Sequence, residues 1–193
     1  MNAKTIQKSS KDLIDTLLKL NKDKDFLERY ETLIDNLLKA INTKNTIFFC
    51  GNGGSFADAQ HLAAELVVRF KENRRAINSI ALGSNQCNLT AIGNDFEFED
   101  IFVRELSALY KEGDIVIMLS TSGNSKNLVK VANYLINNGS KGFSILGKSG
   151  GLLKDLTHNI VIPSKETATI QEVTIVIGHS LCTDIDEHIF FNK

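Results

Sequence analysis

Two short apolar runs in this chain each end in a polar loop that leads directly into a helical pattern. The first run is 46–50 (TIFFC), which is followed by GNGGS and by apolar residues at helical spacing through Ala59, Leu62 and Val67. The second is 114–119 (DIVIML), which is followed by STSGNS and a helical pattern over 128–136. Strands that alternate with helices need crossover connections, so the pattern predicts a mostly parallel sheet with helices on both faces.

The rest of the chain extends this α/β pattern. Further short strands are expected at 77–82, 142–146 and 159–162, and further helices at 98–109 and about 168–190. An N-terminal helical segment covers about 10–41, with a break near 21–25. A length of 193 residues suits one compact domain. We therefore predict a doubly wound α/β fold in a single domain, 1–193, with its core at about 46–193.

The overall composition disfavours several classes of partner. Twenty-two Lys and Arg against 23 Asp and Glu give a net charge of −1, which is not the positive field expected of a nucleic-acid or acidic-membrane binder. The chain has no signal-peptide core and no run of about 18 apolar residues. Its three cysteines, Cys50, Cys87 and Cys182, form no C-x-x-C pair. We expect a cytoplasmic protein with a small-molecule partner, no nucleic acid and no membrane.

The GNGGS loop at 51–55 has room for a ligand at the start of a helix. Its glycines permit close approach to the backbone, and Asn52 and Ser55 add polar groups, so an anion or a sugar could lie there. A dinucleotide site is disfavoured because Phe56 stands where a third glycine is needed and no acidic ribose clamp follows 77–82. The missing G-K-[ST] ending excludes a P-loop. A plain turn between strand and helix remains an alternative.

The STSGNS loop is the stronger candidate for a phosphate site. It places four hydroxyls at a helix start, where free N–H groups and the helix dipole favour an anion. These are Ser120, Thr121, Ser122 and Ser125. A serine-rich helix cap is the alternative, but one cap needs only one side chain.

Two helical pairs could supply acid–base or metal chemistry. His61 and Glu65 are four residues apart and share a helix face. Gln171 and His179 are eight apart, about 80° around a helix, and can also look one way. An imidazole and a carboxylate suit proton transfer, because burial can tune their pKa values towards neutrality. Each pair alone is more often an ordinary surface or half-buried contact.

Asn94 and Asp95 are a weaker candidate for ligands to a sugar. They follow the glycine-containing run 91–93. Taken alone they predict a polar turn.

With these motifs in order, the chain resembles the sedoheptulose-7-phosphate isomerases, or phosphoheptose isomerases, of the sugar isomerase (SIS) domain superfamily. The resemblance covers nearly the whole chain. It rests on CGNGGS with ADAQHLAAEL and RF, on AIGND, LSTSGNS and GKSGG, and on IQE with His179 and Cys182. It implies a homotetramer with active sites between subunits. The implied reaction converts sedoheptulose 7-phosphate to D-glycero-manno-heptose 7-phosphate, a precursor of bacterial surface heptose.

The resemblance also assigns roles to individual residues. Glu65 would be the base that moves a proton between C1 and C2, with His179 opposite it as acid or ring-opening catalyst. Substrate contacts would come from Asn52, Gly53, Gly54, Ser55, Glu65, Asn94, Asp95, Ser120, Thr121, Ser122, Ser125 and Gln171. Several members bind zinc, and the matching ligands are His61, Glu65, Gln171 and His179. Arg69 matches a common position to which the residues themselves assign no role.

The chain departs from the family pattern at two positions. This chain has Thr169 in a stretch where family members commonly have arginine or aspartate nearby. It has Thr174 at a position where members usually have histidine. Both departures bear on the subunit contact and on preference at the sugar end.

Two other functions fit the same fold. Some relatives lack catalysis and associate with the replication initiator, but they have asparagine at the position of His179 and lack the acid at Glu65. Phosphosugar-sensing domains of transcription regulators carry a DNA-binding helix pair, and no such pair or basic segment is found here. The isomerase interpretation is therefore preferred.

Overall fold

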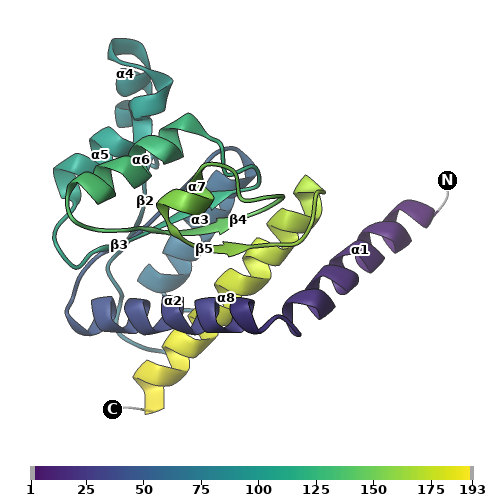
Figure 1. The fold of residues 1–193 in the computed structure, drawn as a ribbon. Helices are drawn as coiled ribbons and strands as arrows, with labels where there is room; N and C mark the ends of the chain where they lie inside the picture. The colour runs from purple at the N-terminus through teal and green to yellow at the C-terminus, as the bar shows by residue number, and fades with distance from the viewer. Residues whose placement is uncertain (1–2, 192–193) are drawn as a thin grey trace.

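Two N-terminal helices lead into a five-stranded sheet in the computed structural model, which describes residues 3–191 (Figure 1). Helix α1 spans Lys4–Leu20 and α2 spans Lys24–Asn42. Asp23 caps α2, because its side chain accepts hydrogen bonds from the N–H groups of Asp25 and Phe26. The predicted break near 21–25 is confirmed.

The remaining elements alternate as predicted, and all five strands are parallel. They are β1 (Ile47–Gly51), α3 (Gly54–Val67), β2 (Ser79–Ala81), α4 (Gln86–Asp95), η1 (Phe98–Asp100), α5 (Ile101–Leu109), β3 (Ile115–Ser120), α6 (Lys126–Asn137), β4 (Phe143–Leu146), α7 (Leu153–Leu156), β5 (His158–Val161) and α8 (Thr167–Phe191). The strand order is β2-β1-β3-β4-β5. No helix within residues 3–191 has the length and apolar content needed to cross a bilayer.

Helices α4 and α7 were not expected from the sequence. The turn predicted at Asn94 and Asp95 is wrong, because both residues end helix α4. That helix begins at a true cap, where the Asn85 side chain accepts from the N–H groups of Cys87 and Asn88. Only Ile92 of α4 is buried, so the helix carries too weak an apolar stripe to be seen by periodicity.

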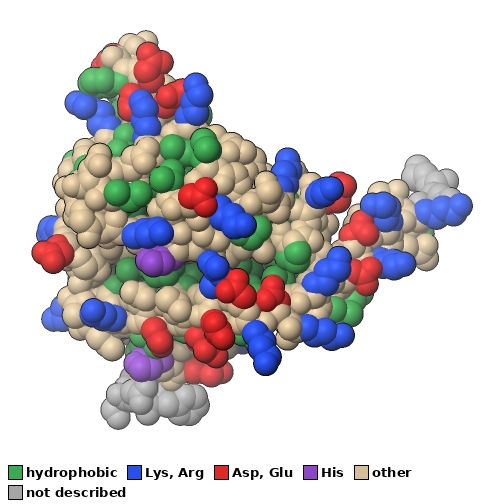
Figure 2. Space-filling model, viewed as in Figure 1, with side chains coloured by type: hydrophobic (Ala, Val, Ile, Leu, Met, Phe, Trp, Pro, Cys, Tyr) green, Lys and Arg blue, Asp and Glu red, His purple; other side chains and the backbone are tan. Residues whose placement is uncertain are grey.

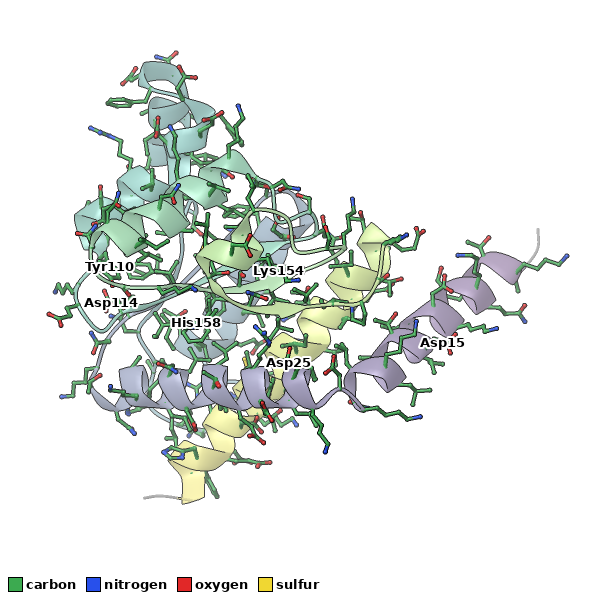
Figure 3. The ribbon with its side chains drawn as sticks, in the orientation of Figure 1. Asp15, Asp25, Tyr110, Asp114, Lys154 and His158 are labelled. Atoms are coloured by element: carbon green, nitrogen blue, oxygen red, sulfur yellow. The ribbon has the colours of Figure 1, made fainter. Side chains whose placement is uncertain are left out.

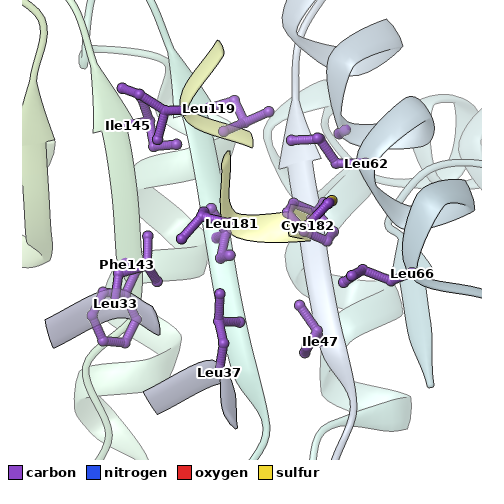
Figure 4. Packing of buried hydrophobic residues seen from close by; sticks show 14 of the residues in the cluster. Leu33, Leu37, Ile47, Leu62, Leu66, Leu119, Phe143, Ile145, Leu181 and Cys182 are labelled. Atoms are coloured by element: carbon purple, nitrogen blue, oxygen red, sulfur yellow. The ribbon is translucent and has the colours of Figure 1, made fainter. Parts of the chain in front are cut away.

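Alternate residues of the buried strands face two separate cores. Ile47 and Phe49 of β1 pack with α2, α3 and α8, as Figure 4 shows for part of this cluster. Phe48 and Cys50 face the opposite side, where α5, α6 and α7 cover the sheet. The expectation of helices on both faces is therefore confirmed. It also explains why all five residues of β1 are buried, because a strand covered on both sides is buried at every position.

The direction of winding reverses between β1 and β3. From β1 the chain proceeds outward to β2, then returns to build β3, β4 and β5 on the other side of β1. The two strands pair directly, with Gly51 opposite Leu119. Their following loops therefore leave the sheet side by side and diverge, which is where doubly wound folds form a ligand crevice.

Asp114 lies at the amino ends of the strands, opposite the end from which the two loops leave. Figure 3 labels it together with His158. The Asp114 carboxylate accepts the N–H groups of Thr46 and Lys111, both at 2.7 Å. It thereby joins the chain just before β1 to the chain just before β3. His158 begins β5 at this same amino edge, away from the loops.

Helices α3 and α8 lie against each other in parallel register. Gly54, the first residue of α3, lies against the Gln171 amide, so a methyl group there would overlap the amide nitrogen. Two turns further on, Gly178 lies against Leu62, and a Cβ at Gly178 would come within 2.5 Å of Leu62 Cδ2. A side chain at either position would therefore displace the Gln171 amide or the buried Leu62 side chain from its present place.

A fully buried ion pair holds the far ends of these two helices together. Arg74 Nε donates to Asp186 Oδ1 on α8 at 2.5 Å, and the two side chains are 0% and 1% exposed. The same guanidinium donates to the backbone oxygens of Glu65 and Leu66 at the end of α3. Burial raises the pKa of Asp186, but bonds from the Glu72 N–H, Arg74 and the Lys71 N–H outweigh it and hold that pKa below its usual value.

We predict that Arg74→Met and Asp186→Asn each lower the free energy of unfolding by about 3–5 kcal/mol, because each leaves an uncompensated buried partner. Urea unfolding at one protein concentration measures this. Lys8→Met, which removes the exposed Lys8–Asp12 pair, should leave stability nearly unchanged.

The acid dependence gives a second readout of the same pair. Because the folded pKa of Asp186 is depressed, its stabilisation is present above the unfolded value of about 3.9 and is lost as the pH falls through the folded value. Asp186→Asn should remove that part of the acid sensitivity. If Arg74→Met and Asp186→Asn lower the free energy of unfolding no more than Lys8→Met does, this account of the buried pair is wrong.

Candidate functional site

The GNGGS and STSGNS loops meet at the crevice between β1 and β3. Asn52 Nδ2 donates to Asn127 Oδ1 at 3.0 Å, and Asn127 Nδ2 donates back to Asn52 Oδ1 at 2.8 Å. Asn127 lies in the first turn of α6 and is buried. Gly53, the residue just before α3, has φ +56°, a backbone conformation that residues with a side chain rarely adopt.

The hydroxyls of the STSGNS loop have different environments. Ser120 is buried and its Oγ accepts the N–H of Gly123 at 3.0 Å, so it shapes the loop from within. Ser122 Oγ accepts the N–H of Asn124 at 3.2 Å. Ser125 is the residue that precedes α6, yet its side chain makes no capping bond. A serine at this position normally caps the helix, so its hydroxyl is left available for a ligand.

The GKSGG segment, 147–151, packs against the STSGNS loop from the β4 side. Asn124 Oδ1 accepts the N–H of Leu152, and the Leu153 N–H donates to Gly123 O, both at 3.0 Å. Gly123 has φ +66°, and a methyl there would overlap the Gly150 carbonyl. The segment therefore supports the loop by backbone contact, and a side chain at Gly123 would not fit.

The structure brings His61, Glu65 and His179 together on the inner faces of α3 and α8. One ligand atom from each lies within 4.8 Å of the others. His61 Nε2 and Glu65 Oε1 are 3.1 Å apart, and the His61 and His179 rings meet edge to face with centroids 5.0 Å apart. The His179 ring also stacks on Phe70 at 5.2 Å. Its Nε2 is buried and has no hydrogen-bond partner among the described residues.

Gln171 stands about two turns earlier in α8 than His179, and its amide lies against Gly54. The four side chains offer two imidazoles, one carboxylate and one amide oxygen. Nitrogen and oxygen donors of this kind suit zinc, and an unpartnered buried imidazole nitrogen fits a metal ligand. Of the set predicted from the sequence, the structure gathers His61, Glu65 and His179, while the contact described for Gln171 is with Gly54.

Two titratable neighbours of this group were not singled out from the sequence for chemistry. Asp58 lies one turn before His61, and its Oδ2 is buried without a described partner. Burial raises the pKa of Asp58, and His61 opposes that effect. Burial, followed by Glu65 and Asp186, raises the pKa of Cys182 to about 12. Cys182 therefore stays a neutral thiol and is a poor nucleophile.

The remaining predicted residues lie elsewhere. Asn94 and Asp95 are exposed at the end of α4, where Asn94 Nδ2 donates to Asp95 Oδ1 at 2.8 Å. Helix α4 projects from the body over α5 in Figure 1. No described contact brings this pair to the two loops of the same chain. Arg69 is exposed, and nothing described assigns it a role.

The two departures from the family pattern face inward. Thr169 and Thr174 are both buried. Thr174 Oγ1 donates to the backbone oxygen of Ile170 at 2.8 Å, one turn earlier in α8. The Thr174 hydroxyl is thus satisfied within its own helix.

Comparison with known proteins identifies the class. The SIS domain model matches residues 11–146. The solved phosphoheptose isomerase from Francisella tularensis superposes with a TM-score of 0.90 at 27% identity, covering 97% of this chain and 100% of that one. That from Neisseria gonorrhoeae gives 0.86 at 31% identity, covering 95% and 98%. The fold is therefore that of a SIS domain, and the chain belongs to that class.

Sequence relatives narrow the assignment further. A phosphoheptose isomerase of Nitratiruptor sp. is 49% identical over 78% of this chain and 81% of its own length. One from Clostridium acetobutylicum is 37% identical over 97% of this chain and 96% of its own length. The chain belongs to the phosphoheptose isomerase family.

Proposed function

We propose that this protein is an aldose–ketose isomerase that converts sedoheptulose 7-phosphate to D-glycero-manno-heptose 7-phosphate, in the supply of heptose for bacterial surface polysaccharides. The observation that carries the proposal is the meeting of Glu65 and His179 between α3 and α8, in a chain that also presents the two polar loops beside Asn52 and Asn127. Family membership supports the same activity.

In the proposed reaction Glu65 acts as the base. Its carboxylate removes the proton from C1 of the ketose while negative charge develops on O2. His179 donates a proton to O2, which gives the enediol. Glu65 then returns its proton to C2, the O1 proton goes back to His179, and the C1 aldehyde forms. No atom is gained or lost, as an isomerisation requires.

The STSGNS loop is proposed to hold the phosphate. The free Ser125 hydroxyl, the Thr121 and Ser122 side chains and the N–H groups at the start of α6 supply donors without a formal charge. Ser120 supports the loop through its bond from Gly123. Asn52, Gly53, Gly54, Ser55 and Gln171 would then contact the sugar from the GNGGS side. Asn94 and Asp95 would have to reach the substrate from another copy of the chain.

We propose that zinc binds His61, Glu65, Gln171 and His179. When bound, it would polarise sugar oxygens and stabilise the negative charge that develops on them. Its donor set brings together α3 and α8, so the ion would also fix the relative position of the two helices.

The cytoplasm is the proposed location. Cys50, Cys87 and Cys182 are all free thiols, which suits a reducing compartment. On the face shown in Figure 2, Lys and Arg side chains are interspersed with Asp and Glu, and neither sign forms a large patch.

The direct test is to incubate the purified protein with sedoheptulose 7-phosphate in D₂O and follow the sugars by NMR. The aldose should appear with deuterium at C2, because a proton held by a carboxylate exchanges with solvent. Absence of the aldose in metal-loaded protein would contradict the proposal. Aldose without any deuterium would mean that the base returns the proton to C2 faster than it exchanges with solvent, and the Glu65 variant then tests the base.

We predict that Glu65→Gln and His179→Asn each lower kcat by about 10²–10⁴-fold, because an amide cannot transfer the proton. Zinc content, measured beside activity, separates loss of the acid or base from loss of metal. His158→Asn, at the opposite edge of the sheet, is the matched control and should keep both activity and zinc. Parental turnover by both site variants would favour the non-catalytic alternative, which neither the present residues nor the family supports.

A second prediction concerns the phosphate loop. Ser125→Ala should raise KM several-fold, since one hydrogen bond is worth about 0.5–1.5 kcal/mol, or more when the acceptor is charged. It should leave unfolding nearly unchanged, because Ser125 does not cap α6. Asp23→Ala removes a true cap and should do the reverse, with stability lower by about 1 kcal/mol and KM unchanged. Unaltered KM in Ser125→Ala would remove Ser125 from the phosphate site.

We also predict a homotetramer. Helix α1 extends from the body (Figure 1), and it exposes Ile14 and Leu18 at 55% and 51%. Val176 on α8 is also 41% exposed, and apolar faces of this kind are normally covered by a partner. Light scattering at micromolar concentration should give the mass of four chains. A monomer would contradict the proposal and the shared sites that Asn94 and Asp95 require.

A further inference from the structure

Asn127 is buried, polar and outside the set of residues so far given a role. Its relative exposure is 2%, and both ends of its amide are used. Oδ1 accepts from Asn52 Nδ2 at 3.0 Å and from the Leu128 N–H at 3.0 Å, while Nδ2 donates to Asn52 Oδ1 at 2.8 Å.

The Leu128 N–H fixes which way both amides face. A backbone N–H can only donate, so the Asn127 atom beside it must be the oxygen. The Asn127 NH₂ must then face Asn52, and the Asn52 oxygen must receive it. The orientation of Asn52 in the GNGGS loop is thus set by a backbone group in the first turn of α6, on the other side of the crevice.

The same bond changes the role of Ser125. The N–H of Leu128, three residues after Ser125, is the group that a capping serine side chain usually satisfies. Here it donates to Asn127 Oδ1 and to the Ser125 carbonyl oxygen, and the Ser125 hydroxyl makes no capping bond. Asn127 Oδ1 therefore accepts the N–H that a capping serine would normally accept, and the Ser125 hydroxyl stays free.

We propose that Asn127 is a positioning residue of the isomerase site, which orients the Asn52 amide toward the sugar and keeps Ser125 available to the phosphate. It couples the sugar-binding loop to the phosphate-binding loop across the β1–β3 crevice. This inference rests on the proposed function, since Asn52 and Ser125 are the substrate contacts through which Asn127 acts.

A double-mutant cycle tests the coupling. Wild type, Asn127→Ala, Asn52→Ala and the double variant are compared by kcat and KM with sedoheptulose 7-phosphate. Asn127→Ala should lower kcat/KM about 10- to 100-fold, because small displacements of binding groups cost that much. If Asn127 acts through Asn52, the double variant should be no more than about threefold worse than the poorer single variant. Losses that multiply would overturn the proposal.

Asn159→Ala is the matched control for simple loss of a buried amide. Asn159 of β5 is 8% exposed, and its Nδ2 donates to the backbone oxygens of Lys154 in α7 and of Thr157, which precedes β5. Its loss should lower stability but leave kcat/KM unchanged. Equal kinetic damage in Asn127→Ala and Asn159→Ala would mean that Asn127 is structural only.

If Asn127→Ala fails to fold, Asn127→Asp takes its place in the cycle. The aspartate keeps the size and both acceptor roles but cannot donate to Asn52 Oδ1, so the same lack of additivity with Asn52→Ala is expected. A wild type without turnover would contradict the proposed function instead. The cycle is then read from calorimetric affinity for the same sugar phosphate, where additive losses still overturn the coupling.

Discussion

The contact between α3 and α8 is the constraint on which the rest of the site depends. Glu65 and His61 come from one helix and Gln171 and His179 from the other, so their spacing is set only by how closely the helices approach. Gly54 and Gly178 leave room for side chains of the other helix, Gln171 and Leu62, to pack directly on the backbone. At the other end, the Arg74–Asp186 pair, whose side chains are inaccessible to solvent, joins the last turn of α3 to α8. A buried ion pair is costly to form, and its geometric specificity here fixes helix register.

The crevice depends on a second constraint, the reversal of winding between β1 and β3. Two neighbouring parallel strands must send their loops in opposite directions, which opens a space that no crossover helix covers. The paired amides of Asn52 and Asn127 cross that space and limit how far the loops can separate. Backbone packing of GKSGG on the STSGNS loop limits the remaining freedom. A phosphate can then be held by hydroxyls and N–H groups whose positions are fixed before it binds.

These two constraints hold different chemistry at two places in the fold. The start of α6 offers hydroxyl and N–H donors, and the titratable groups gather where α3 and α8 touch. In the proposed reaction this separation keeps the charge of the phosphate away from the carboxylate that accepts a proton. Burial, followed by the carboxylates of Glu65 and Asp186, keeps the other titratable group at this contact, Cys182, as a neutral thiol.

The sequence by itself determined the alternation of the main strands and helices, the break before α2, the two polar loops and the shared face of His61 and Glu65. Such features depend on neighbours in the chain, and apolar periodicity reports them directly. It missed α4, whose single buried residue leaves no stripe, and it gave no sign of Asn127 or of Arg74 with Asp186. Periodicity tells which face of an element is buried but not what lies opposite, and these pairs join residues 75 and 112 positions apart. Only the tertiary structure decided that α8 lies along α3, because that choice follows from how the whole sheet is covered.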